Sequence, residues 1–202
     1  PSVSELLLKA QWCILGYRDV LEDDWFAPYV ERAYHMNLIS DGTSFDPSSD
    51  ATRSQIVTVL GREYERESGS SLPDVTCDAF VDIPDGAFYE KYCAWGAETG
   101  IVKGIDTYAF GPDEKVTREQ IATFLHRLAI YQCLVSSGDY DVRYLDSFAD
   151  GSKVSEYAQE PICWAIAAGI LTGDDQNCLN PQSSATRSEM ITMMVRFADY
   201  YD

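Results

Sequence analysis

The sequence predicts an all-α, mainly helical protein made of three divergent copies of one helix–loop–helix unit. Three segments align along their length, namely residues 17–62, 80–127 and 148–196. Each contains two stretches with helical hydrophobic spacing, and each second stretch begins with the same capping signal. No copy could bury its apolar face alone, so we expect a shared core closed around a pseudo-threefold axis, with a central bundle of one long helix per copy.

The first predicted element is an additional helix over residues 4–15, where Leu7, Leu8, Trp12 and Leu15 fall at helical spacing. We assign it to an N-terminal segment, residues 1–16, that packs on the repeats. The three repeats with their connections then occupy residues 17–79, 80–147 and 148–202. We expect 61–74 and 134–143 to be polar connections, into which the ends of the second helices run.

The first half of each repeat predicts a short amphipathic helix. It opens with an aromatic residue, any residue and an aspartate, and a second aromatic residue follows six or seven positions later. Twelve positions beyond that aromatic residue, a Gly or Asn precedes two aliphatic residues, as at a helix end in the left-handed conformation. The residues in question are Asp19, Asp82 and Asp150; Trp25, Phe88 and Tyr157; and Asn37, Gly100 and Gly169.

The second half of each repeat predicts a longer helix with a defined start. A polar loop ends on a proline, and an arginine stands six residues later within Thr-Arg-x-Gln or Thr-Arg-x-Glu. Thr followed at the third position by Gln or Glu is a capping box, and an apolar residue before each box forms a hydrophobic staple. The arginines are Arg53, Arg118 and Arg187, and the staple residues are Ala51, Val116 and Ala185.

Composition narrows the functional classes. The 202 residues are 46% hydrophobic and 24% charged, as in a folded soluble protein. The formal charge of −18 repels nucleic acid and anionic lipid, so we expect neither as a partner. No apolar run approaches ~18 residues, so we expect no membrane insertion. The chain begins at Pro1 rather than Met, and we expect it to be part of a longer protein whose signal peptide lies elsewhere.

The cysteines predict no metal site. Six cysteines form no C-x-x-C pair, and there are only two histidines, so we expect neither zinc nor another cofactor. An even number of cysteines permits disulfides, and the first candidate pair is Cys77 with Cys133, which flank the middle repeat. Cys93 and Cys163 lie within apolar helical patterns, where a buried free thiol is expected.

These motifs together resemble the S-layer homology (SLH) domain family. The order is aromatic-x-Asp, a second aromatic, Gly-aliphatic-aliphatic, Phe-x-Pro and Thr-Arg-x-Glu/Gln, and the match covers about nine tenths of the chain. The resemblance implies a three-pronged, pseudo-trimeric helical monomer without catalytic activity. It also implies a place on the bacterial cell surface, with non-covalent anchoring to secondary cell-wall polysaccharide that is often pyruvylated.

The resemblance further implies glycan sites in grooves between adjacent repeats. Carried over by position, the glycan-binding residues are Arg53, Arg118 and Arg187; Asp19, Asp82 and Asp150; Trp25, Phe88 and Tyr157; and the loop glycines Gly104 and Gly173, with Gly42 an approximate match. A guanidinium suits a carboxylate or phosphate, an aspartate accepts from hydroxyls, and an aromatic face covers a sugar ring. Because the first loop is shorter, we expect fewer than three working grooves, and Arg53 to matter least.

Each of these residues also has a structural interpretation. The arginines could pair with the early aspartates to lock the repeats together, and the aspartates could form caps or turns. The aromatic residues could be packed rather than exposed, above all Trp95 and Trp164. These alternatives are left open by the sequence.

Three other functions remain to be weighed against wall anchoring. Degenerate SLH repeats could serve protein–protein assembly or scaffold a neighbouring domain, without binding glycan. Catalysis is not expected, because no nucleophile–base set or placed carboxylate pair is evident. Calcium binding is the last alternative: residues 174–177 are acidic, but they lack the spacing of an EF-hand loop.

Overall fold

The computed structural model describes residues 14–138 and 140–201, and this part of the chain is helical. It contains no extended strand, only isolated bridges between loops. The predicted all-α class is confirmed. The helices are η1 (Ile14–Gly16), α2 (Ala27–His35), α3 (Arg53–Ser68), α4 (Glu90–Glu98), α5 (Arg118–Tyr131), η2 (Val142–Ser147), η3 (Gly151–Lys153), η4 (Glu156–Ala158), α6 (Gln159–Ala167) and α7 (Arg187–Tyr201).

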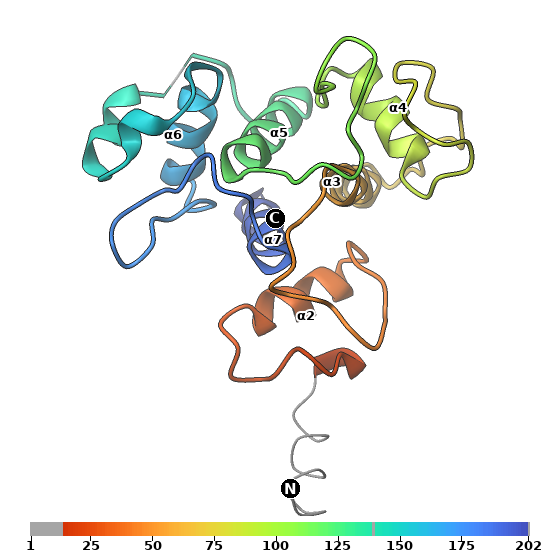
Figure 1. Ribbon diagram of the computed structural model, residues 1–202, viewed down its shortest axis with the longest axis horizontal. Coiled ribbons are helices and arrows are strands. Elements are labelled where there is room, and N and C mark those ends of the chain that lie inside the picture. Colours follow the sequence, from red (N-terminus) through yellow and green to blue (C-terminus); the bar gives the residue numbers. More distant parts are fainter. Residues whose placement is uncertain (1–13, 139, 202) are drawn as a thin grey trace, which may run out of the picture.

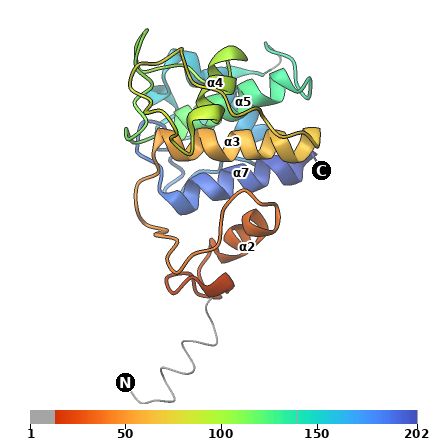
Figure 2. The same cartoon turned by 90° about the vertical axis from the view of Figure 1, so that its right-hand side faces the viewer.

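The three long helices lie at the centre, and the three short helices lie outside them. α3, α5 and α7 all contact one another, while α2, α4 and α6 form separate projections (Figure 1; Figure 2). Each short helix packs on the long helix of the preceding repeat, in the pairs α4 with α3, α6 with α5, and α2 with α7. The contact of α2 with α7 joins the first repeat to the third, so the three repeats contact one another in a closed cycle.

The helix ends form as the sequence predicts. Thr52 and Thr117 each accept the backbone N–H of a glutamine three residues on, whose side chain accepts the threonine N–H in return. Thr186 and Glu189 form the same reciprocal pair at α7. The short helices are followed by Asn37, Gly100 and Gly169, whose φ angles are 59°, 74° and 68°.

A ring of backbone hydrogen bonds joins the segments that lead into the long helices. Ala51 N donates to Ala185 O at 2.8 Å, Ala185 N donates to Val116 O at 2.9 Å, and Val116 N donates to Ala51 O at 2.9 Å. All three residues are fully buried. The predicted staple residues therefore also close the three repeats into a cycle. A threefold relation among the repeats stays a prediction, for which this cycle is the main support.

Some expectations fall outside the described residues or are wrong. The helix predicted over residues 4–15 falls almost wholly on residues 1–13, outside the described residues, and Ile14–Gly16 form the short 3-10 turn η1. The second helix of the first repeat runs to Ser68, into the 61–74 connection as expected, whereas α5 ends at Tyr131, before the 134–143 connection. Among the described residues, no helix is both long and apolar enough to cross a membrane.

The predicted disulfide between Cys77 and Cys133 is wrong, because both thiols are free. Cys77 is buried beside the start of α4, where its N–H faces Glu90, whereas Cys133 is exposed in a left-handed turn after α5. Although both cysteines flank the same repeat in the sequence, they lie in different environments in the structure. Cys93 and Cys163 are buried free thiols, as predicted.

Candidate functional site

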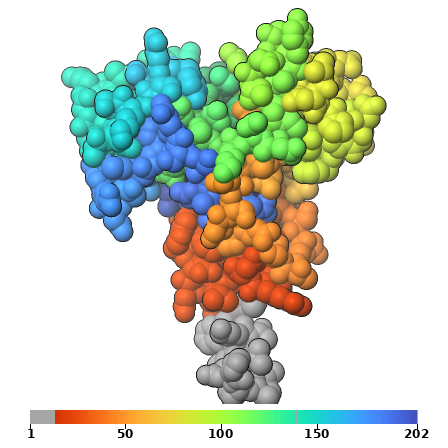
Figure 3. All heavy atoms as spheres, in the orientation of Figure 1, coloured from red at the N-terminus to blue at the C-terminus, as the bar shows by residue number. Residues whose placement is uncertain are grey.

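Three grooves lie between the repeats, and each is built from all three of them. Groove 1 is formed by the loop of the first repeat and α3, groove 2 by the second loop and α5, and groove 3 by the third loop and α7. Figure 3 shows the three repeats as separate lobes. The groove volumes are about 260, 400 and 480 Å³, so grooves 2 and 3 fall within the usual size range of small-molecule sites.

Each groove receives the Thr-Arg arginine of the preceding repeat in this cyclic order. Arg187 reaches groove 1, Arg53 reaches groove 2 and Arg118 reaches groove 3. The divergent first loop therefore borders Arg187, and the reason for expecting Arg53 to matter least is wrong. The cause is the direction of the long helices, which sequence alignment of single repeats does not show.

These arginines hold loop carbonyls rather than the early aspartates. Arg53 Nε donates to Phe110 O at 2.8 Å, Arg118 Nε to Leu179 O at 2.8 Å, and Arg187 Nε to Phe45 O at 2.7 Å. The guanidinium of Arg53 also lies over the Phe110 ring, 4.7 Å from its centroid. Burial lowers the pKa of Arg53 and Arg187, because a low dielectric disfavours the charge.

The early aspartates bind the same loop residues from the other side. Asp82 accepts from Phe110 N at 2.8 Å and from Gly111 N at 2.7 Å. Asp19 and Asp150 accept the corresponding pairs of amides at the ends of the first and third loops. Burial alone would raise the pKa of Asp19, but the bonds from Phe45 N, Ser44 and Asp46 N outweigh it and lower that pKa.

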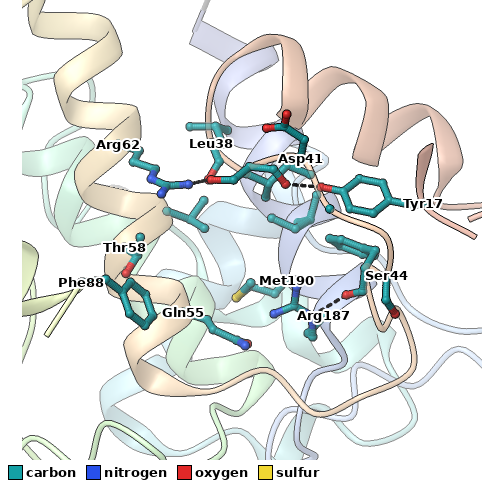
Figure 4. Close-up of a pocket in the computed structure, with 16 residues that line it drawn as sticks. Tyr17, Leu38, Asp41, Ser44, Gln55, Thr58, Arg62, Phe88, Arg187 and Met190 are labelled. Carbon is teal, nitrogen blue, oxygen red and sulfur yellow. Dashed lines mark hydrogen bonds between the residues drawn. The ribbon is translucent and has the colours of Figure 1, made fainter. Parts of the chain in front are cut away.

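The second aromatic residue of each repeat is exposed at the far side of a groove. Trp25 is 59% exposed in groove 3, Phe88 66% in groove 1 and Tyr157 52% in groove 2. In Figure 4, Phe88 and Arg187 approach Gln55 from opposite sides of groove 1. The interpretation that the aromatic residues are packed is therefore wrong for the second aromatic residue of each repeat, and it is confirmed for Trp95 and Trp164, which are buried.

Tyr157 differs from the other two groove aromatics because its hydroxyl is tied down. It donates to Glu119 Oε1 at 3.0 Å, and the buried Glu119 also accepts from the N–H and hydroxyl of Ser155. Burial, together with this bond to Glu119, raises the pKa of Tyr157 to about 12. The ring is therefore held in one orientation at the edge of groove 2.

The loop glycines fit against the opening aromatic residue of their own repeat. A Cβ on Gly104 would lie 2.3 Å from Ala109 O and 2.8 Å from the Phe80 ring. A Cβ on Gly173 would lie 3.0 Å from the Phe148 ring. These glycines shape the loop that forms one wall of the groove.

A second arginine on each long helix was missed by the sequence analysis. Arg62, Arg127 and Arg196 stand nine residues after the Thr-Arg arginines and donate to Leu38 O, Ile101 O and Ile170 O. Nine residues are about two and a half helical turns, so the two arginines lie on opposite faces and line different grooves. Their recurrence at one spacing was the signal that could have identified them.

The third groove differs in its electrostatics. Arg118 Nη1 forms an ion pair with Glu189 Oε1 at 2.9 Å, and Arg118 Nη2 donates to Thr172 O at 3.1 Å. The equivalents of Glu189 are the uncharged Gln55 and Gln120 in grooves 1 and 2. The loop geometry is therefore the same in the three grooves, but the residue corresponding to Glu189 carries a negative charge only in groove 3.

Comparison with known proteins places these repeats in one family. The model of the S-layer homology domain matches residues 16–57, 79–122 and 147–191. These matches cover most of the chain and coincide with the three repeats that form the grooves.

The relatives are much longer proteins with varied names. An endoglucanase of Bacillus sp. (strain KSM-635) is 29% identical over 86% of this chain and 18% of its own length. Exoglucanase XynX of Acetivibrio thermocellus is 25% identical over 84% of this chain and 15% of its own length. The surface-layer 125 kDa protein of Lysinibacillus sphaericus is 27% identical over 79% and 13%. The chain therefore spans less than a fifth of each of these relatives.

Proposed function

Because this chain belongs to the S-layer homology domain family, we propose that it anchors a larger surface protein non-covalently to the bacterial cell wall. The proposed ligand is secondary cell-wall polysaccharide, with pyruvyl groups among its substituents, bound in grooves 1 to 3. The relatives support a non-catalytic role, since a surface-layer protein and glucan-degrading enzymes share this segment as a small part of their length.

One observation carries the proposal: every groove places an exposed aromatic ring opposite an arginine that comes from another repeat. The pairs are Phe88 with Arg187, Tyr157 with Arg53, and Trp25 with Arg118. Exposed aromatic side chains recurring at one position indicate a binding surface. An aromatic face covers the apolar side of a sugar ring, and a guanidinium binds hydroxyl or anionic oxygen atoms.

The remaining predicted residues contribute in a different way in this proposal. Asp19, Asp82 and Asp150 keep the end of each loop in place, and Gly104 and Gly173 let the loop lie close to the aromatic residue below it. The arginines both contact glycan and hold the loop that forms the groove wall. Binding and loop geometry are therefore coupled at these positions.

The test is co-sedimentation of the protein with purified cell-wall sacculi. Trp25→Ala, Phe88→Ala and Tyr157→Ala should each weaken binding, and the triple variant should lose most of it. Tyr108→Ala is the matched control, because Tyr108 is 70% exposed and lines none of the three grooves. Wall binding by the folded triple variant at the level of the parent would contradict the proposal.

Arginine variants need a stability measurement beside the binding measurement. Arg118→Ala and Arg187→Ala remove a charge-assisted contact of about 1.5–3 kcal/mol, which corresponds to roughly 10- to 150-fold in affinity. Each also releases a loop carbonyl, so a thermal melt must show that the variant is folded. Capture of a specific protein, with no binding to sacculi, would favour an assembly module instead.

A further inference from the structure

Glu119 distinguishes the second repeat at a helix position whose backbone is the same in all three. The residue that follows each Thr-Arg arginine donates its N–H to the carbonyl of a loop proline, at 2.9 to 3.1 Å. These residues are Ser54, Glu119 and Ser188, and their acceptors are Pro112 O, Pro181 O and Pro47 O. The side chains differ, because only the second repeat has a carboxylate at this position.

The Glu119 carboxylate is buried and binds the third repeat. The residue is 4% exposed, and its Oε1 accepts from the Ser155 hydroxyl at 2.8 Å and from the Tyr157 hydroxyl at 3.0 Å. Oε2 accepts from Ser155 N at 3.1 Å. Glu119 also stands in the first turn of α5, where the helix dipole favours a negative charge. A buried carboxylate is costly unless it is hydrogen-bonded, so these contacts are what stabilise the charge.

The two serines at the equivalent positions bind elsewhere. Ser54 Oγ shares a hydrogen bond with the Thr52 hydroxyl at 3.0 Å, and Ser188 Oγ donates to Pro47 O at 2.9 Å. Both contacts stay within the helix start and the loop next to it. In the described part of the chain, Glu119 is therefore the one residue of the three that bonds to a groove aromatic residue.

The aromatic residues of the grooves differ in a matching way. In grooves 1 and 3, this residue packs edge-to-face against the aromatic residue that follows it, with ring centroids 5.0 and 5.5 Å apart; the pairs are Phe88 with Tyr89 and Trp25 with Phe26. Tyr157 in groove 2 is followed by Ala158, which offers no ring. Where the other two repeats have a neighbouring ring, the third repeat has a hydroxyl bonded to Glu119.

Groove 2 depends strongly on the Tyr157 ring. Arg53 is 4% exposed and donates to Phe110 O and Lys103 O, so little of its guanidinium is open to a ligand. The corresponding arginines of grooves 1 and 3 are partly exposed. The one proton of the Tyr157 hydroxyl is donated to Glu119, so the exposed ring face is what Tyr157 offers to a sugar.

We infer that Glu119 is a positioning residue for groove 2: across the boundary between the second and third repeats, it holds the Tyr157 ring in the orientation that covers a sugar ring. This inference rests on the proposed function. A side chain that is already ordered loses less conformational freedom on binding, which favours affinity by about two- to twelvefold. Glu119 thus does by a hydrogen bond what Tyr89 and Phe26 do by packing in the other two grooves.

Four variants separate this role from a purely structural one. Glu119→Ser introduces the residue that the other two repeats have, so the helix start is retained and the bond to Tyr157 is lost. Glu119→Gln keeps an acceptor oxygen and serves as the rescue. Tyr157→Phe removes only the hydroxyl, and it tests the same bond if Glu119→Ser folds poorly. Ser188→Ala is the matched control, because it removes a buried hydrogen bond at the same position of α7 and leaves the Glu119–Tyr157 bond in place.

Binding is measured by titration calorimetry with short oligosaccharides cut from purified wall polysaccharide. The protein carries Trp25→Ala and Phe88→Ala, so that only groove 2 keeps its aromatic residue, and a thermal melt checks that each variant is folded. We expect Glu119→Ser and Tyr157→Phe each to weaken binding by about two- to twelvefold. The two changes together should weaken it no further, because they remove the same contact. Glu119→Gln and Ser188→Ala should leave the affinity unchanged.

The mobility of the Tyr157 ring reports its positioning without any ligand. NMR relaxation of isotope-labelled tyrosine rings measures it, and the Tyr157 signal is assigned by its absence from Tyr157→Phe. We expect a rigid ring in the parent and in Glu119→Gln, and a mobile ring in Glu119→Ser. A residue that only stabilised the fold would change the melting temperature without this selective change at Tyr157.

The outcomes distinguish this inference from the proposed function. Undiminished affinity of Glu119→Ser, additive losses in the double variant, or an equally rigid Tyr157 ring in Glu119→Ser would each overturn the inference and leave wall anchoring intact. The same holds if the intact protein binds the oligosaccharides and the Trp25→Ala/Phe88→Ala protein does not, because groove 2 would then bind no sugar by itself. Absence of binding by the intact protein to both oligosaccharides and sacculi would overturn both.

Discussion

At the residue scale, each loop depends on one residue whose backbone N–H and C=O are held from opposite sides. Asp82 accepts the N–H of Phe110 at 2.8 Å, while Arg53 from another repeat donates to the carbonyl of Phe110 at 2.8 Å. The Phe110 side chain is fully buried, with the Arg53 guanidinium over its ring. The same arrangement occurs at Phe45 and Leu179. The aspartate and the arginine thus cooperate without forming an ion pair with each other.

Removing one of these carboxylates should destabilise the protein. Asp82→Ala leaves the amides of Phe110 and Gly111 without their acceptor, at a cost of about 1 to 3 kcal/mol. The free energy of unfolding from urea titration is the measurement. Asp85→Ala is the control, because Asp85 is exposed and three residues away. Equal stability of Asp82→Ala and Asp85→Ala would show that the loop amides find other partners.

The two loop glycines should differ in how strictly they are required. A Cβ on Gly104 would meet the backbone oxygens of Ala109 and Asp106 at 2.3 and 2.5 Å, whereas the tightest contact of one on Gly173 would be the edge of the Phe148 ring at 3.0 Å, with Cys178 O at an ordinary 3.5 Å. A ring can shift by a few tenths of an ångström more easily than two backbone carbonyls. We therefore expect Gly104→Ala to lower the urea midpoint more than Gly173→Ala, with a cost of about 1 to 3 kcal/mol for overpacking. The reverse ranking would contradict this account.

At the element scale, the capping boxes set where the long helices begin. Thr117 accepts from Gln120 N at the start of α5, and Gln120 Oε1 accepts from Thr117 N in return. Thr117→Ala should cost about 1 kcal/mol, while Thr117→Ser should retain most of the stability because the hydroxyl remains. Thermal unfolding of both variants beside the parent tests this. An alanine variant as stable as the serine variant would show that the side-chain cap contributes little.

The contact between α5 and α6 contains a buried histidine. His126 is 4% exposed between the rings of Trp164 and Tyr140, and its Nε2 has no hydrogen-bond partner and lies 3.9 Å from Glu160 Oε1. Burial lowers the pKa of His126, and nearby Arg127 acts in the same direction while Glu160 opposes it. The folded protein therefore takes up a proton here less readily than the unfolded chain does.

This histidine should make stability depend on mildly acidic pH. Its unfolded pKa of about 6.5 lies above its folded pKa, so its contribution is fully present above about pH 6.5 and is lost as pH falls toward the folded value. We expect His126→Gln to lose less stability than the parent between pH 7 and about pH 5.5. Urea midpoints at several pH values measure this. Parallel pH profiles for the two proteins would rule out His126 as the cause.

At the scale of the whole molecule, the sequence predicted the parts better than their assembly. The capping boxes and the left-handed helix ends depend on residues three or fewer apart, and they formed as expected. The ring through Ala51, Val116 and Ala185 joins residues about 65 or more apart, for which local patterns carry no information. The facing of Arg53 into groove 2 likewise depends on how α3 lies against the next repeat.

The predicted arginines, second aromatic residues and loop glycines line the grooves, but the sequence did not show how these residues are arranged. The exposure of Trp25, Phe88 and Tyr157 follows from the packing of one repeat against another, which the sequence left open. The role of the aspartates in closing loops follows from where the loop amides point. The pairing of Arg118 with Glu189 brings together residues of two repeats, and it makes groove 3 differ from groove 2, where the residue corresponding to Glu189 is Gln120.

The cyclic packing predicts that no repeat can be removed without loss of the fold. α7 contacts α2, α3 and α5, and Ala185 both donates to and accepts from the ring. A chain ending at residue 147 would expose the apolar faces of three helices and leave Ala51 N and Val116 O without their partners. We expect this fragment to lack a cooperative thermal transition and defined near-ultraviolet dichroism, whereas the intact chain unfolds in one step, because each repeat contributes surface that the others bury. A cooperative melt of the fragment close to that of the intact chain would show instead that two repeats already form a complete core.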